Sequence, residues 1–237
     1  MVKVKFFSLI SLISFLLSGV ILADSGFLAD NISVNADVSY LSKYGSRITI
    51  GDENGVLEKT FGISLFDFSA SVWSNQGLKK DDNGDLSNEV NYTLEYGRTF
   101  FEKLNLALGY TRYDFPDNDA DSDEIYIVAS YDFLITPQFL LANDTTNGGR
   151  YFEFDLSYTQ PIIENLSLGL GATYGIYNKY GADEDEGSGF DFRLEIACNL
   201  SENLILTPNI HLLTGTTKNL EEYDDEVYGG VSLSYSL

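Results

Sequence analysis

Apolar and polar residues alternate along most of this chain with a period of two. One face of the last segment, 227–237, carries apolar side chains: Val227, Val231, Leu233, Tyr235 and Leu237. The opposite face carries small and polar residues: Tyr228, Gly230, Ser232, Ser234 and Ser236. This period predicts β-strands with one apolar face, which either covers a protein core or faces lipid.

Twelve such segments can be marked, at 32–40, 58–65, 68–75, 89–96, 104–113, 124–133, 138–143, 150–159, 166–177, 190–200, 204–213 and 227–237. The connectors between them alternate in length. Short ones lie at 66–67, 101–103, 134–137, 161–165 and 201–203, and long polar ones at 41–57, 76–88, 114–123, 144–149, 178–189 and 214–226. Outer-membrane barrels show this rhythm of short periplasmic turns and long external loops. We therefore expect an all-β fold, a twelve-stranded antiparallel transmembrane β-barrel of up-and-down type, closed by pairing of 227–237 with 32–40.

The polar faces of these segments carry charge. The charged residues and the single histidine that we expect to line a pore are Asp37, Glu89, Glu95, Asp132, Glu153, Asp155, Asp191, Arg193, Glu195 and His211. A soluble sandwich or lipocalin-like barrel would also alternate. Twelve strands enclose a wide interior, however, and a water-filled lumen suits these charges better. Tyrosines near the strand ends fit an interfacial girdle: Tyr40, Tyr96, Tyr110, Tyr131, Tyr158, Tyr174 and Tyr235.

The first residues have the pattern of an export signal. Lys3 and Lys5 precede an apolar run, and Ala23 offers a cleavage site before Asp24. We expect a signal peptide at 1–23 and one barrel domain at 24–237, located in the cell outer membrane. The formal net charge is −22, which disfavours nucleic acid as a partner. The single cysteine, Cys198, excludes an intramolecular disulfide.

Two motifs resemble the TorF-like family of outer-membrane porins of Gram-negative bacteria. The segment 42–47 (Ser-Lys-Tyr-Gly-Ser-Arg) follows the first strand and resembles the family's Ser-x-Tyr-x-x-Arg element through Tyr44 and Arg47. The segment 68–75 resembles the family's third strand with its Trp73. The acidic insertions and the terminal Leu237, where Phe is usual, depart from the pattern. The resemblance implies a porin and brings no substrate with it.

Acidic residues in a pore favour cations or neutral solutes. Our main hypothesis is a porin for passive diffusion of small solutes, weakly cation-preferring and without a cofactor. The alternative is a non-conducting structural or surface-interaction barrel whose acidic loops bind cations or lipopolysaccharide. An enzyme is not expected, because His211 is the only histidine and no Gly-x-Ser-x-Gly motif is present.

The acidic loops suggest loose binding of cations, but their sequences do not match a dedicated metal-binding motif. Asp117 to Asp123 begins like a calcium loop, but Ser122 and Val128 stand where an EF-hand needs Gly and Glu. Further acidic runs at 183–186 and 221–226 fit loose binding of divalent cations that bridge to lipopolysaccharide in the surrounding outer-membrane lipid. Among the loops, 41–57 is expected to fold into the barrel, because Ile48-Thr49-Ile50 is too apolar for a free tip.

Overall fold

The computed structural model describes residues 31–80, 88–117, 121–180, 186–215 and 225–237. The expected signal peptide, 1–23, lies outside the described residues. Within the described ranges, no helix combines the length and the hydropathy that a membrane crossing requires.

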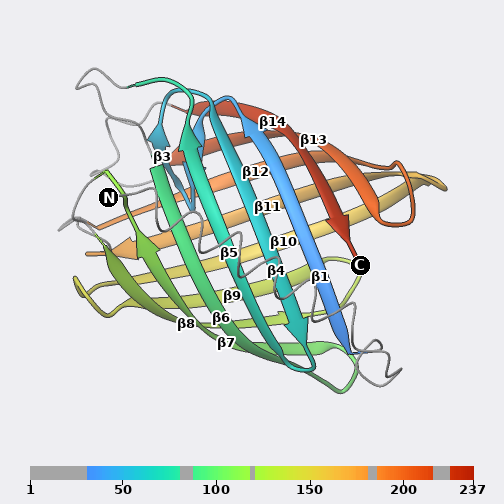
Figure 1. Ribbon diagram of the computed structural model, residues 1–237, viewed down its shortest axis with the longest axis horizontal. Helices are drawn as coiled ribbons and strands as arrows, with labels where there is room; N and C mark the ends of the chain where they lie inside the picture. The colour runs from blue at the N-terminus through green and yellow to red at the C-terminus, as the bar shows by residue number, and fades with distance from the viewer. Residues whose placement is uncertain (1–30, 81–87, 118–120, 181–185, 216–224) are drawn as a thin grey trace, which may run out of the picture.

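The described residues form β-strands (Figure 1). In chain order they are β1 (Ile32–Leu41), β2 (Tyr44–Ser46), β3 (Thr49–Asp52), β4 (Val56–Leu65), β5 (Phe68–Gly77), β6 (Asn88–Phe100), β7 (Leu104–Asp114), β8 (Ser122–Tyr131), β9 (Thr136–Asp144), β10 (Arg150–Ile163), β11 (Leu166–Asn178), β12 (Glu186–Asn199), β13 (Leu204–Gly215) and β14 (Glu226–Ser236). Twelve of them make one closed antiparallel barrel, and β2 and β3 form a separate hairpin between β1 and β4. The predicted fold class is therefore confirmed.

The barrel closes through its first and last strands. β14 pairs antiparallel with β1, with Val38 opposite Leu233 in the register. Val34 and Leu237 exchange two backbone hydrogen bonds of 2.9 Å each. The closing strand is thus paired on both sides, which leaves the sheet without an edge.

The connections alternate as the sequence indicates, with two corrections. The turn predicted at 134–137 lies earlier, because β9 already begins at Thr136. The turn predicted at 161–165 is shorter, because β10 continues to Ile163 through a register irregularity after Pro161. Proline can occupy such a position, where the ladder needs no N–H donor. The five short turns all lie at one end of the barrel, which in this architecture is the periplasmic end.

The outer surface of the barrel is a band of exposed apolar side chains. Leu94 on β6 is 61% exposed, and Phe68 on β5 is 63% exposed. The expected girdle tyrosines share this face, and Tyr40 and Tyr131 are each 45% exposed. Large contiguous apolar surfaces are rare on water-soluble proteins, whereas a bilayer solvates them and a closed barrel satisfies the backbone within it. The outer face therefore fits lipid rather than water.

Leu94→Arg tests this assignment. Leu94 lies in the middle of β6, so an arginine there would place a charge in the hydrocarbon layer and should cost about 2–4 kcal/mol of unfolding free energy. Thr93→Arg is the matched control, because the neighbouring side chain points to the lumen and should cost less than half as much. Urea unfolding in lipid vesicles measures both variants. Equal losses would contradict the lipid-facing assignment.

Candidate functional site

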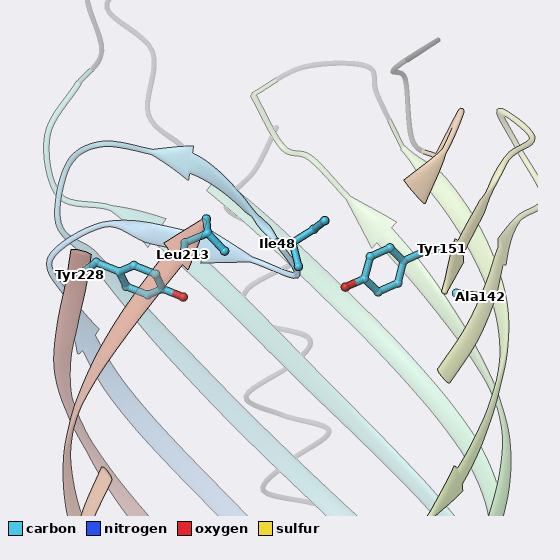
Figure 2. Close-up of a cluster of buried hydrophobic side chains, with 5 residues drawn as sticks. All are labelled: Ile48, Ala142, Tyr151, Leu213 and Tyr228. Atoms are coloured by element: carbon cyan, nitrogen blue, oxygen red, sulfur yellow. The ribbon is translucent and has the colours of Figure 1, made fainter. Parts of the chain in front are cut away.

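The β2–β3 hairpin folds into the lumen at the long-loop end of the barrel. Ile48 at its tip is only 4% exposed and belongs to a buried apolar cluster. Figure 2 shows Ile48 between Tyr228 and Leu213 on one wall and Tyr151 and Ala142 on the other. The inward folding expected for this loop is confirmed, and its reason is the burial of the apolar tip.

Glycines on the barrel wall make the space that the hairpin occupies. A Cβ atom at Gly175 on β11 would lie 2.8 Å from Ile48 Cγ2 and 2.5 Å from the Tyr151 hydroxyl. A Cβ atom at Gly45 of the hairpin would lie 2.5 Å from the Tyr228 ring. Any larger residue at either position would collide with its neighbours, so the hairpin and the wall have complementary shapes.

Arg47 occupies the turn of the hairpin in a left-handed backbone conformation, with φ 56°. The turn is closed by Thr49, whose hydroxyl donates to the Ser46 carbonyl at 2.9 Å. Such a conformation is uncommon for a residue with a Cβ atom and often marks a functional position. Here it directs the longest side chain of the turn against the barrel wall.

The Arg47 guanidinium is held by three groups of the wall and by Tyr180 in the loop after β11, and we call these four groups the Arg47 seat. Nη2 donates to Glu124 Oε2 at 2.7 Å and to the Tyr113 hydroxyl at 3.2 Å. The same guanidinium lies over the rings of Tyr151 (4.3 Å) and Tyr180 (4.8 Å). Burial disfavours the charge of Arg47, but the oxygens of Tyr113 and Glu124 outweigh burial and raise its pKa. Arg47 therefore remains a cation in the lumen.

Two further side chains fix the base of the hairpin. Lys43 Nζ donates to Glu226 Oε2 at 2.6 Å and also contacts Glu53. The hydrogen bonds to these two carboxylates raise the pKa of Lys43. The Tyr44 ring lies 6.1 Å from the Trp73 ring, and its hydroxyl donates to Glu89 at 2.7 Å. Burial is the main reason that the pKa of Tyr44 is raised, so the hydroxyl stays a donor.

A cavity of about 310 Å³ lies between the hairpin and the wall. Aromatic side chains dominate its lining: Tyr44, Tyr113, Phe115, Tyr151, Tyr177 and Tyr180. The three charged side chains that also line it are Arg47, Glu89 and Asp144. A second cavity, of about 280 Å³, is lined by the hairpin residue Gly45 and by the lumen residues Asp37, Glu58 and His211.

The residues predicted to line a pore lie on the face opposite the exposed apolar one. They are Asp37 on β1, Glu89 and Glu95 on β6, Glu153 and Asp155 on β10, Asp191, Arg193 and Glu195 on β12, and His211 on β13. Asp132 needs a correction, because β8 ends at Tyr131 and Asp132 lies in the exposed turn after it. Asn105 binds it there at 3.1 Å, so Asp132 belongs to the periplasmic rim. A pore-lining role for the set stays a prediction.

Several of these carboxylates accept hydrogen bonds from hydroxyl groups, which carry no charge. The bonds run from Ser39 Oγ to Asp37 (2.8 Å), from Tyr126 Oη to Glu95 (2.8 Å) and from Tyr151 Oη to Glu153 (2.9 Å). Neutral donors orient a carboxylate without cancelling its charge. The lumen wall therefore keeps negative charge at these positions.

Arg193 lies between Asp191 and Glu195 in the sequence, but its ion pair is with a residue of another strand. Its Nη2 lies 2.6 Å from Asp155 Oδ1, whereas the nearest Asp191 oxygen is 4.0 Å from Nη1. The side chain crosses β11 at Gly171, where a Cβ atom would lie 2.7 Å from the guanidinium. Because the glycine leaves this space, the guanidinium reaches a carboxylate two strands away.

His211 is also engaged with its neighbours. Its Nδ1 lies 3.1 Å from Asp191 Oδ2, and its ring stacks on Tyr228 at 4.6 Å between centroids. The expectation of a polar lumen histidine without a catalytic role assigned it no partners. Tyr228 also belongs to the apolar cluster around Ile48, so the stacked pair places His211 next to the residues that contact the hairpin tip.

Sequence reasoning missed four lumen acids: Glu58, Glu124, Asp144 and Glu226. Glu58 lines the second cavity, and Glu124 and Glu226 hold the two basic residues of the hairpin. Glu58, Glu124 and Glu226 stand within four residues of a strand start, and Asp144 is the last residue of β9. The alternation in the sequence is ambiguous at such margins. The available signal was an acidic residue at the margin between an alternating segment and a long polar loop.

The acidic loop runs are only partly described. Residues 118–120, 183–185 and 221–224 of these runs lie outside the described residues. Among the residues that are described, no three His, Cys, Asp or Glu side chains are grouped closely enough to hold a metal ion.

Comparisons with known proteins agree on the fold. No protein-family model matches the chain, and no curated protein matches it. The solved structure of the NanC porin superimposes with a TM-score of 0.58 at 13% identity, covering 85% of this chain and 100% of that one. The COG4313 outer membrane channel from Pseudomonas putida F1 gives 0.54 at 8% identity, covering 87% and 96%. At these identities the likeness shows the architecture, and the resemblance to the TorF-like family stays a prediction.

The fold and the apolar outer band together define the class of this protein. It is a twelve-stranded outer-membrane β-barrel with a polar lumen and a hairpin folded into that lumen.

Proposed function

We propose that this protein is a porin that lets small solutes diffuse passively through the barrel, with a weak preference for cations. The observation that carries the proposal is the negative charge of the lumen wall. Asp37, Glu95 and Glu153 bind neutral hydroxyl donors, so their charge is not compensated by these contacts. A ring of such carboxylates raises the local concentration of cations.

The basic side chains of the lumen do not oppose this preference. Lys43, Arg47 and Arg193 each lie against at least one carboxylate. A paired base adds little positive potential, because its partner cancels most of its field. The wall therefore presents excess negative charge to a passing solute, and neutral solutes are not repelled.

The hairpin narrows the path, and this observation also favours a second candidate function. If the hairpin closes the lumen permanently, the protein is a non-conducting barrel whose acidic loops bind cations or lipopolysaccharide. The proposed surroundings are outer-membrane lipid and lipopolysaccharide in both cases. The β2–β3 hairpin is a separate two-stranded sheet outside the strand ladders of the barrel, which supports a passage that can open without unfolding of the wall.

Conductance in planar bilayers distinguishes the porin from the non-conducting barrel. Refolded protein should produce discrete current steps, because each inserted barrel adds one water-filled path. Heat-denatured protein at the same concentration serves as the control and should give none. Absence of steps across a wide voltage range would contradict the porin function and favour the non-conducting barrel.

A further inference from the structure

None of the four groups of the Arg47 seat comes from the β2–β3 hairpin. Tyr113 lies on β7, Glu124 on β8 and Tyr151 on β10, and Tyr180 follows β11. Arg47, by contrast, arrives from the β2–β3 hairpin. Three groups of the seat therefore belong to the barrel wall and one to the loop after β11, whereas the hairpin supplies the occupant.

The chemistry of the seat selects a guanidinium group. The two tyrosine rings, at 4.3 and 4.8 Å from the guanidinium carbon, offer flat faces to a planar cation. Glu124 and the Tyr113 hydroxyl accept hydrogen bonds from one edge of the same group. A guanidinium combines a flat charged surface with several donors in one plane, whereas an ammonium is compact and more strongly hydrated.

The space next to the seat is large enough for a solute. The cavity of about 310 Å³ is lined by Arg47, Tyr113, Tyr151 and Tyr180 and extends to further acidic side chains. This volume is at the lower end of the range of small-molecule sites. A solute that placed one end in the seat would therefore have room for the remainder of its length.

Two further carboxylates next to the seat suit a second positive charge, since Asp144 stands opposite Glu124 in the β8–β9 ladder and Glu89 lies on β6. Asp144 is buried, and its carboxylate is oriented by hydrogen bonds from the backbone N–H of Thr146 (2.9 Å) and of Asn147 (2.9 Å). Glu89 accepts from Tyr44 and Asn91, both of which are neutral donors. Both carboxylates line the cavity, so an amine of the solute would be favoured next to either of them and a carboxylate of the solute would be repelled.

We propose that the Arg47 seat and the adjoining cavity bind a small dication with a guanidinium at one end and an amine at the other, which takes the place of Arg47. Displacing Arg47 removes the ionic attachment of the hairpin tip and leaves the apolar contacts of Ile48, so the same exchange would favour opening of the path to the solute. This last step rests on the proposed porin function, whereas the binding does not.

Arg47 is attached to the barrel through the hairpin and competes with the solute for the seat, and this competition sets the affinity expected for the solute. A group held by a short loop competes at an effective concentration in the millimolar range. The native protein should therefore bind the solute weakly, and removing the Arg47 side chain should strengthen binding by about tenfold or more. Arg47→Gly is the appropriate variant, because glycine tolerates the φ of 56° without strain.

Calorimetric titration of the refolded protein with agmatine tests the proposal. Putrescine is the matched control, because it is a dication of similar length that lacks the guanidinium. The Arg47→Gly protein should bind agmatine about tenfold more tightly than the native protein does, and about tenfold more tightly than it binds putrescine. The proposal would be overturned if Arg47→Gly bound agmatine and putrescine with equal affinity, or if it bound agmatine no more tightly than the native protein does.

A second variant covers the case in which Arg47→Gly does not fold. Replacing 42–55 by Asn-Gly removes the hairpin and leaves all four groups of the seat. This barrel should show the same preference for agmatine, and Glu124→Gln in this background should abolish it. Retention of the preference without the Glu124 carboxylate would also overturn the site. Calorimetric titration measures binding whether or not the barrel conducts. Failure of the proposed site is therefore distinguishable from failure of the proposed porin function.

Discussion

Removing the β2–β3 hairpin should raise the single-channel conductance severalfold. Leu41 and Val56 are opposite each other in the β1–β4 ladder, so Asn-Gly in place of 42–55 would join the two strands by a tight two-residue turn. The hairpin tip now fills the space between Tyr151 and Tyr228, on opposite walls of the lumen (Figure 2). Without it, the path widens at this level.

The conductance of the shortened protein should be compared with that of the full chain in the same bilayer. Circular dichroism and the heat-dependent mobility shift in SDS gels show whether the barrel is intact. An intact barrel with unchanged conductance would mean that the hairpin does not narrow the path. The double replacement Phe133→Ala and Leu134→Ala, in a periplasmic turn far from the hairpin, is a control that should leave the conductance unchanged.

Arg47→Gly should destabilise the folded protein by about 3 kcal/mol, because one partner of a largely buried ion pair is lost. The Glu124 side chain is only 3% exposed, so its charge would remain without its cation. Glycine is chosen because it adopts the φ of this turn more readily than alanine. The measured loss then reports the side chain rather than backbone strain.

The double variant Arg47→Gly with Glu124→Gln separates the two causes of this loss. If the unpaired carboxylate is responsible, neutralising Glu124 should recover more than half of the lost unfolding free energy. Urea unfolding in vesicles gives the unfolding free energies of the native protein, the two single variants and the double variant, which together make a double-mutant cycle. Additive losses for the two substitutions would show that Arg47 and Glu124 do not stabilise one another.

The strands and the inward hairpin were predictable from local patterns. A period of two in the sequence sets which face each residue occupies, and the alternation of loop lengths fixes the count of strands. The apolar pair Ile48 and Ile50 in a polar loop indicated burial without any knowledge of the partner. These signals are local, so one sequence is enough to detect them.

The side-chain contacts within the lumen were not predictable, because they depend on the register in which neighbouring strands pair. Arg193 has acidic neighbours two positions away on its own strand, yet it reaches Asp155 two strands away across the space at Gly171. The four groups of the Arg47 seat come from positions between 113 and 180, which no spacing in the sequence brings together. Asp132 shows the remaining limit, since an error of two residues at a strand end moves a side chain from the wall to the rim.

The reversal potential in a salt gradient tests the central claim most directly, because it requires both a water-filled path and a negatively charged wall. With concentrated KCl on one side of the bilayer and dilute KCl on the other, the native protein should pass K⁺ more readily than Cl⁻. The dilute side would then become positive at zero current. A potential near zero, or one of the opposite sign, would contradict a lumen governed by Asp37, Glu95 and Glu153.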